Sequence, residues 1–460
     1  MKHLFGIIVF AGTVSIAAPA MAGTIIATTS DYETGNTAVF RTGNGAFSPN
    51  ALGHADQDVV ADTDGEYVYF LERSRGAVSK FAPDRLSAGE VVWQYSVGPT
   101  SNPQDIVFLD DRAYVIRAGT GSVLKVNRDA ASASSFAIGE IDLSGFDTDS
   151  VPDAVHGFLA GGRVYVVCQR LHGFAADTPG LLVAIDPATD AVIDLDPDAL
   201  GVQGRELLVK NPQSFSQVGG MLYIGGHVWG AQTEGVQTVD AANPLLPQAM
   251  LAGEASNGMD ITGAAVFSAS LGIVMSASWV QDSGGNWIQV GAAYWFDPRT
   301  GALGQPLPVP APEGGAVFVD GVVYVGSRDN SNPGLYRIDP ASNAAAGEPL
   351  ITTLPPVSMI VTDTPPVMVD AGPTGFELRP PFPNPFNPAA TVTFSIDSPG
   401  RVRAAVFSLA GQRVAVLSDR VWPAGTHALT WNAGGFPSGM YLARVSANGF
   451  TRSVSMTLVK

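Results

Sequence analysis

The sequence is poor in cysteine, histidine and basic residues, and each shortage excludes a class of protein. Cys168 is the only cysteine, so no disulfide forms within the chain, and its place in the apolar run 164–168 indicates a buried, unreactive thiol. The six histidines are scattered, which argues against a zinc site built from closely spaced ligands. Acidic residues outnumber basic ones by 42 to 25, and this disfavours binding to nucleic acid or to an anionic membrane surface.

Long hydrophobic runs are also missing. The one mostly apolar stretch, Leu4–Ala18, has fifteen residues, fewer than the roughly 20 that a membrane-spanning helix needs. It follows the basic start Met1-Lys-His, and the small residues of Ala20-Met-Ala22 come after it. This order is typical of a signal peptide. We therefore expect residues 1–22 to be removed between Ala22 and Gly23, and the mature protein to be exported without a transmembrane segment.

The charge is distributed unevenly along the chain. Residues 373–460 contain three acidic and eight basic residues, a net charge of +5, whereas residues 23–372 have a net charge of −23. The simplest consequence of such an acidic region is solubility. A second consequence would be attraction of divalent cations or of basic partners.

The last part of the chain has the pattern of a small β-sandwich. Prolines at 380, 381, 383, 385 and 388 exclude a helix or a central strand, so this segment is expected to be extended. Short alternating segments follow, separated mostly by glycine or proline. About seven short strands in under a hundred residues indicate an immunoglobulin-like sandwich over residues 373–460. The segments are 391–396, 402–407, 413–417, 427–431 and 441–445.

The same region resembles the C-terminal sorting domain of bacterial type IX secretion cargo and the immunoglobulin-like domain of flagellar hook-capping proteins. The resemblance rests on Pro-Asn-Pro-Phe-Asn-Pro (383–388), 407–413, 424–427, Trp431, 438–441 and the terminal Leu-Val-Lys. The family usually has Val-Tyr after Ser-Gly and a basic residue before the final apolar run. This chain has Met440-Tyr441 and 455–460 instead, which leaves the secretion route open. The resemblance implies contact with the secretion machinery, delivery to the cell surface or medium, and removal of the domain.

Between the two ends lies a repeat. Each copy has an apolar strand with an aromatic residue, a polar loop, a second strand and then Asp-Pro with a turn. In that turn proline fixes φ, and a following Asp, Asn or Gly tolerates the left-handed conformation. The turn is expected to join the third and fourth of about four antiparallel strands. The clearest copies are 163–167 with 182–190, 286–290 with 294–301, and 322–325 with 335–343; looser copies lie at 67–84, 113–129 and 221–240.

This repeat predicts a β-propeller over residues 23–362. The turns recur every 42 to 58 residues, and no long amphipathic helix interrupts them. Strands at 24–27 and 38–40 suggest one more blade, and 357–361 is a candidate closing strand, which gives about seven blades. The repeats resemble extracytoplasmic propellers of the YVTN and NHL type, a likeness of fold rather than of activity. Residues 363–372 are expected to form a short linker.

The loops that enter the innermost strands are the best candidate sites. By repeat position they contain His54, Asp58, Asp105, His156, Asp260 and Glu313. The four carboxylates offer the hard oxygens that Ca²⁺ prefers, so calcium is the candidate cofactor. His54 and His156 are candidate general bases or transition-metal ligands. The structural alternative is that acidic and amide residues cap turns at these positions, as they do in loops generally.

Three functions remain open at this stage. The first is a binding module that holds a protein, peptide or glycan on one propeller face, with Trp229, Trp279 and Trp287 as candidate contact residues. The alternative is a propeller enzyme of the lactonase, lyase or dehydrogenase type with a cation in the central channel. The third is a surface-layer component that assembles with itself.

Overall fold

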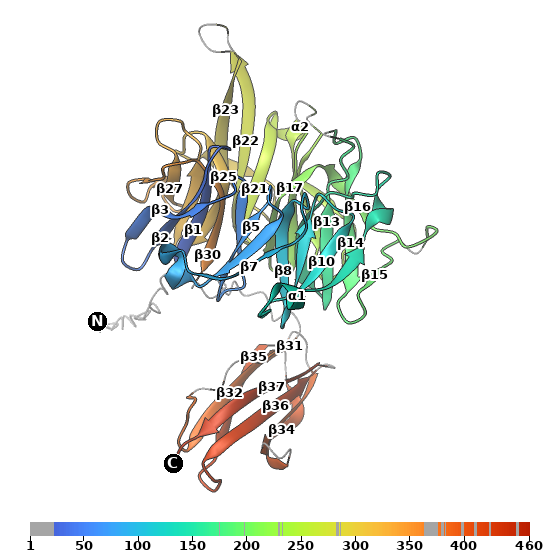
Figure 1. The fold of residues 1–460 in the computed structure, drawn as a ribbon, viewed down its shortest axis with the longest axis vertical. Coiled ribbons are helices and arrows are strands. Elements are labelled where there is room, and N and C mark those ends of the chain that lie inside the picture. The colour runs from blue at the N-terminus through green and yellow to red at the C-terminus, as the bar shows by residue number, and fades with distance from the viewer. Residues whose placement is uncertain are drawn as a thin grey trace, which may run out of the picture.

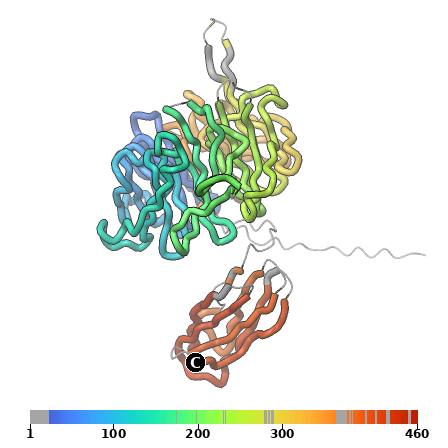
Figure 2. The backbone as a smooth tube through the Cα atoms, turned by 90° about the vertical axis from the view of Figure 1, so that its right-hand side faces the viewer, coloured from blue at the N-terminus to red at the C-terminus, as the bar shows by residue number. Residues whose placement is uncertain are grey.

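The computed structural model describes residues 23–362 and 376–460, apart from short gaps. The regular structure of both parts is almost entirely β-strand, which confirms the predicted all-β class. Figures 1 and 2 show a larger and a smaller body, built from these two parts of the chain. The predicted signal peptide, with Ala22, and the predicted linker lie outside the described residues. The gaps are 174, 197, 229–230, 232, 282–284, 286, 379–380, 382, 397–399, 409–411, 423–424 and 448–449.

The larger body is a β-propeller, as predicted, and its described strands form seven antiparallel sheets. The first three blades are β30 (Pro356–Thr362), β1 (Thr24–Ser30), β2 (Gly35–Arg41) and β3 (Ala46–His54); β4 (Val59–Thr63), β5 (Val68–Glu72), β6 (Ala77–Phe81) and β7 (Val91–Ser96); and β8 (Pro103–Leu109), β9 (Arg112–Arg117), β10 (Ser122–Asn127) and β11 (Ala137–Asp142). The strand named first in each blade contacts the first strands of both neighbouring blades, so these seven strands surround the axis.

The other four blades follow in chain order, and two of them carry an additional short strand. They are β12 (Ala154–Ala160), β13 (Arg163–Cys168), β14 (Pro179–Asp186) and β15 (Ala191–Ile193), with β16 (Arg205–Lys210) also paired to β14; β17 (Pro212–Val218), β18 (Met221–Gly226), β19 (Gly235–Asp240) and β20 (Ala249–Gly253); β21 (Asp260–Ser268), β22 (Leu271–Gln281), β23 (Trp287–Phe296) and β24 (Leu303–Pro306); and β25 (Pro312–Val319), β26 (Val322–Ser327), β27 (Gly334–Asp339) and β28 (Ala344–Ala345), with β29 (Leu350–Ile351) also paired to β27.

Helices are few and short in the described parts of the chain. They are η1 (Pro83–Ala88), α1 (Ala133–Phe136), η2 (Ser144–Phe146) and α2 (Glu254–Asn257). None of the helices in the described residues has the length and apolar character to cross a bilayer.

The predicted Asp-Pro turns join the third and fourth strands. Asp186 ends β14, and its carboxylate accepts hydrogen bonds from the Ala188 N–H at 2.9 Å and from the Thr189 hydroxyl at 2.9 Å. Asp190 then takes the left-handed conformation, with φ of 59°. Asp339 caps the turn after β27 in the same way, and Asn343 there has φ of 54°. The turn sequence therefore fixes where each third strand ends.

Large apolar side chains fill the space between neighbouring blades. The tyrosine of the predicted Tyr-Val strand lies in the second strand of its blade and is at most 1% exposed at Tyr69, Tyr114 and Tyr165. Cys168, in the same strand as Tyr165, is fully buried, and burial raises the pKa of its thiol. This environment agrees with the unreactive thiol expected from the sequence.

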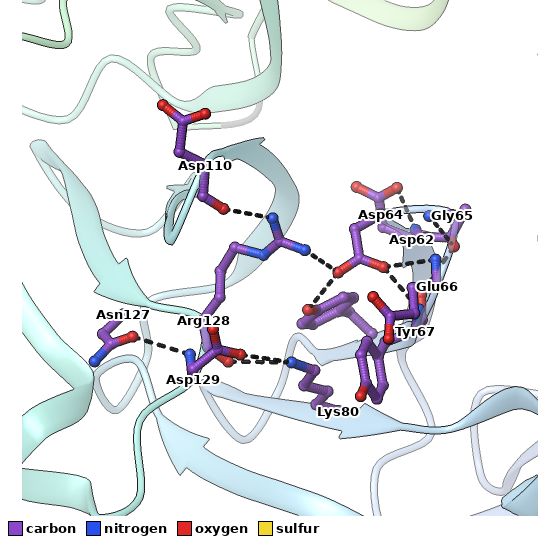
Figure 3. A network of polar contacts seen from close by, with 12 residues as sticks. Asp62, Asp64, Gly65, Glu66, Tyr67, Lys80, Asp110, Asn127, Arg128 and Asp129 are labelled. Atoms are coloured by element: carbon purple, nitrogen blue, oxygen red, sulfur yellow. Dashed lines mark hydrogen bonds and ion pairs between the residues drawn. The ribbon is translucent and has the colours of Figure 1, made fainter. Parts of the chain in front are cut away.

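A polar network also connects blades two and three (Figure 3). Asp64 accepts a hydrogen bond from the Tyr69 hydroxyl at 2.8 Å and forms an ion pair with Arg128, which directly follows β10. Lys80 donates to the Arg128 carbonyl at 3.2 Å and lies 4.0 Å from the centre of the Tyr67 ring. Each charged group thus has a partner on the neighbouring blade. We assign this network to holding the two blades together.

The smaller body is a sandwich of two antiparallel sheets, as predicted. One sheet contains β31 (Phe376–Leu378), β32 (Ala389–Ile396) and β35 (Gly425–Asn432), and the other contains β34 (Arg413–Trp422), β33 (Gly400–Ser408), β36 (Gly439–Ala447) and β37 (Phe450–Leu458). Its core includes Phe394, Trp431 and Tyr441. The proline-rich start packs against the last strand, because the Phe386 N–H donates to the Thr457 carbonyl at 2.9 Å. Four of the motifs that carry the resemblance therefore contribute to one core, through Phe386, Trp431, Tyr441 and Leu458.

Candidate functional site

The innermost strands of blades three, four and five begin with the same backbone conformation. The residue before each strand, Asn102, Asp153 or Asn211, has φ between 43° and 50°. Its carbonyl accepts a hydrogen bond from the residue that follows the second strand. The pairing register then shifts by one residue, at Pro103/Asp105 for example. This shift is a β-bulge, and a bulge changes the direction in which the next side chain points. The recurring Asn and Asp at these entries therefore serve the backbone, in agreement with the structural alternative.

Asp105 and His156, two of the six predicted residues, come together after these bulges. His156 Nδ1 lies 2.6 Å from Asp105 Oδ2, and the same oxygen accepts the Gly157 N–H at 2.8 Å. On its other side the imidazole stacks on Phe215, with ring centres 4.3 Å apart and planes 10° apart. Innermost strands of three successive blades thus build one arrangement across 110 residues of sequence.

Asp62, on β4, extends this arrangement to a fourth blade. Burial, the negative charge of Asp105 and a hydrogen bond with Asp105 hold the pKa of Asp62 well above its usual value. Burial would also raise the pKa of Asp105, but the charge and hydrogen bond of His156 outweigh it and lower that pKa. We infer that Asp62 keeps its proton and that Asp105 carries the negative charge.

The sequence contains a signal for Asp62 that repeat reasoning missed. Asp62 pairs across the sheet with Tyr69, and the residues that pair with the equivalent tyrosines of the next two blades are Val107 and Phe158. A carboxyl group at a position that is apolar in neighbouring repeats is a candidate for a special role.

His156 has one nitrogen available. Its side chain is 24% exposed, and Nε2 makes no hydrogen bond with the residues that the structure describes. Because Asp105 holds Nδ1, the ring orientation is fixed and Nε2 is directed away from that carboxylate. The arrangement can accept a hydrogen bond from a ligand or take up a proton.

The other four predicted residues do not join this pair. Asp58 lies 3.5 Å from Arg73, Glu313 lies 3.6 Å from Arg328, and Asp260 begins β21 without a charged partner among the described residues. The described parts of the chain contain no group of three or more His, Cys, Asp or Glu side chains placed to hold a metal ion. The calcium site therefore stays a prediction. So do the candidate tryptophans, since Trp229 and the side chains of Trp279 and Trp287 lie outside the described set.

His54 lies between blades one and two. Its Nε2 is 2.6 Å from the Thr37 hydroxyl, and its ring meets Phe70 edge-on with centres 4.7 Å apart. Burial lowers the pKa of His54 from 6.5 to about 4. A site in which the neutral imidazole packs against an aromatic ring suits a structural role.

This lowered pKa predicts acid sensitivity of the fold. In the unfolded chain His54 takes up a proton near pH 6.5, but in the folded protein only near pH 4, so stability is lost as the pH falls between these values. Replacing His54→Gln removes this contribution, and we expect the loss of unfolding free energy between pH 7 and pH 4 to shrink by about 1–3 kcal/mol, measured by denaturant titration.

His172 provides a control of opposite sign. Hydrogen bonds with Asp177 and Asp147 raise its pKa, so its contribution is present at low pH and is lost as the pH rises through that pKa. His172→Gln should therefore make the loss towards pH 4 larger. Equal pH profiles for His54→Gln and the unmodified protein would contradict the assignment.

Comparison with known families identifies the C-terminal part of the chain. Residues 381–459 match the family model of the secretion system C-terminal sorting domain, which confirms the resemblance found in the sequence and indicates export. No curated protein sequence matches the chain.

Several solved structures are similar to part of this chain. Hydrazine synthase of Kuenenia stuttgartiensis is 14% identical, with 66% of this chain and 90% of that chain covered and a TM-score of 0.46. AztD of Citrobacter koseri is 12% identical, with 74% and 98% covered and a TM-score of 0.43. A 6-phosphogluconolactonase-like protein of Bacteroides fragilis is 12% identical, with 74% and 98% covered and a TM-score of 0.47. At these sequence identities and TM-scores, the activities of these proteins cannot be assigned to this chain. The sheet topology of residues 24–362 makes this part a β-propeller, and the match at residues 381–459 identifies a C-terminal sorting domain, which indicates export.

Proposed function

We propose that the propeller is a binding module that holds a basic group of an extracellular protein or peptide at the Asp105–His156 pair, after the sorting domain has delivered the chain to the surface or medium. The observation that carries this proposal is the pair itself. Its geometry is fixed by Gly157 and Phe215, and one imidazole nitrogen remains available.

Charge favours a basic group over other partners. Residues 23–372 have a net charge of −23, and such a field raises the local concentration of cations and their rate of association. At the pair, an arriving guanidinium or ammonium group would find the Asp105 carboxylate as acceptor, joined by His156 Nε2 when the imidazole is neutral. Protonated Asp62 supports this carboxylate without adding a second charge.

The test compares three variants that change one carboxyl group each. Peptides with a single central arginine serve as probe, and the same peptides with glutamine serve as reference, both measured by calorimetry. We expect Asp105→Asn to weaken arginine-peptide binding by about tenfold or more, because a hydrogen bond between charged groups is lost. Asp62→Asn should change the affinity by less than about threefold, since this side chain is already neutral.

Asp84→Asn is the matched control. Asp84 is exposed on η1 and lies in the same acidic region, so this variant removes one charge without touching the pair. An equal effect of Asp84→Asn and Asp105→Asn would show that only the overall charge attracts the peptides. Failure to discriminate arginine from glutamine peptides would also contradict the proposal.

The Asp105–His156 geometry supports an enzyme as second candidate. A carboxylate that holds Nδ1 leaves Nε2 to act as a general base, which is the role such a pair has in proton-transfer enzymes. With lactones as probe substrates, His156→Asn should abolish turnover. The cation of this candidate has its own test, the melting temperature of the protein at millimolar calcium. A melting temperature that calcium does not change would exclude Ca²⁺ as a cofactor.

A further inference from the structure

The outer face of the four-stranded sheet of the sandwich, here named the arginine face, carries four of the eight basic residues of residues 373–460. Strand alternation and the pairing register place its residues in rows across the sheet. Arg403, for example, lies between Asp419 of β34 and Ser446 of β36. The face consists of Arg401, Arg403, Ala405, Phe407, Arg413, Val416, Asp419, Val421, Met440, Leu442, Arg444, Ser446, Ser453, Ser455 and Thr457.

The positive charge of the arginine face is only partly neutralised. Asp419 is its one acidic residue, and it lies 2.8 Å from Arg401 Nε and 3.5 Å from Arg403 Nε. One carboxylate thus serves two guanidinium groups. Arg413 and Arg444 form no ion pair with the part of the chain that the structure describes. The face therefore has a net charge of +3 that an acidic partner could neutralise.

Apolar side chains lie among these arginines. Val416, Val421 and Met440 are 58%, 69% and 49% exposed. The Arg444 guanidinium lies 4.9 Å from the centre of the Phe407 ring, which holds it over that ring. Exposed apolar groups set among polar ones mark interaction surfaces, and arginine, methionine and aromatic residues are enriched at protein interfaces. The composition of the face is that of an interface.

The other sheet of the sandwich has a different outer surface. The described outward residues of its strands β32 and β35 are small or neutral: Ala389, Thr391, Thr393, Ala428, Thr430 and Asn432. None of these six residues is charged. Solubility alone favours charges of both signs spread over the surface. The concentration of arginine on one sheet therefore indicates a specific contact.

The choice of arginine indicates the class of partner. Residues 373–460 contain seven arginines and one lysine. Anionic lipid surfaces attract lysine and arginine alike, whereas protein interfaces are enriched in arginine and depleted of lysine. An acidic protein surface with apolar groups of its own is thus the partner that fits this face.

We propose that the arginine face is the surface by which the sorting domain binds the secretion machinery, and that it meets an acidic, partly apolar protein surface there. The family match at residues 381–459 indicates export but specifies neither the face nor the chemistry of the contact. This proposal concerns delivery of the chain and is independent of the function proposed for the Asp105–His156 pair.

The experiment measures export of the full chain in a bacterium that has the secretion system. The exported fraction is determined from immunoblots of cells, cell surface and medium. Replacing Arg403→Gln together with Arg444→Gln should lower this fraction by about threefold or more, because two charges that face the partner are lost. Both side chains are exposed, so the melting temperature of the sandwich in purified residues 23–460 should stay within about 3 °C.

Arg420→Gln together with Arg452→Gln is the matched control. These exposed arginines belong to the same sheet but pair with Val402 and Val445, whose side chains are buried, so they lie outside the arginine face. The control removes the same charge from the same domain and should leave the exported fraction within about 1.5-fold. If the first double variant melts at a lower temperature, Arg413→Gln together with Val421→Thr decides, since it changes the same face at the two ends of β34.

Four results would overturn the proposal. Unchanged export of the Arg403/Arg444 variant would show that the face makes no contact that export needs. An equal loss in both double variants would show that only net charge matters. Binding of residues 23–460 to phosphatidylglycerol vesicles that the Arg403/Arg444 variant loses would assign the face to a membrane. A shift of the propeller transition in that variant would instead assign the face to docking on the propeller of the same chain.

Discussion

A chain that lacks residues 373–460 should fold into a stable propeller but should no longer leave the cell. All seven blade sheets and their closing strand lie within residues 24–362, and the sandwich core consists only of residues from 376 onward. We therefore expect the melting temperature of residues 23–372 to stay within about 3 °C of the propeller transition of the full chain. In a bacterium with the secretion system, immunoblots should find the shortened protein inside the cell instead of at its surface or in the medium.

A point variant in the sandwich is the matched control for this deletion. Phe386 is 2% exposed and packs on Trp431 with ring centres 5.6 Å apart, and its N–H donates to the last strand. Phe386→Ala should destabilise the sandwich by about 3–5 kcal/mol and reduce export while the propeller transition is unchanged. A shortened propeller that melts far below the full-length protein, or one that is still exported, would refute the independence of the two parts.

The local features of the propeller were the most predictable. The turn at Asp186 and the buried strand around Tyr165 each depend on neighbouring residues. Their repetition indicated six blades, and the strands at the two ends of residues 23–362 indicated the seventh. The closing strand was indicated by apolar residues at 357–361, although its partner strand at the other end of the chain could not be read from spacing. Repetition predicts strands and turns well because each copy contains the same turn residues and the same pattern of apolar residues.

The site was predictable only in part. Asp105 and His156 were candidates separately, but their contact depends on bulges that sequence spacing does not reveal. Asp62 was missed because it lies inside β4, whereas candidates were sought only in the loops that enter the innermost strands.

Removal of β30 as well should have the opposite outcome from removal of the sandwich alone. Residues 23–355 lack β30, which is the innermost strand of blade one and pairs with β1 from Thr24↔Thr362 to Thr29↔Pro356. The Ser358 hydroxyl also bonds Thr28 at 2.8 Å and accepts the Ala61 N–H of blade two at 3.1 Å. Without β30, strand β1 has an open edge and the ring has no closure, and an open edge invites aggregation.

The expected loss of unfolding free energy is comparable to the whole stability of a typical domain, about 5–15 kcal/mol. Circular dichroism and light scattering should therefore show residues 23–355 to be unfolded or aggregated. Residues 23–362, which retain β30, are the matched control and should melt like residues 23–372. Ser358→Ala in the full chain is a milder test of the same contact. Loss of the two hydrogen bonds should lower the unfolding free energy of the propeller by about 1–3 kcal/mol. The prediction is wrong if residues 23–355 melt cooperatively near the melting temperature of residues 23–362. The remaining contacts between the first and last blades would then be enough to close the ring without β30.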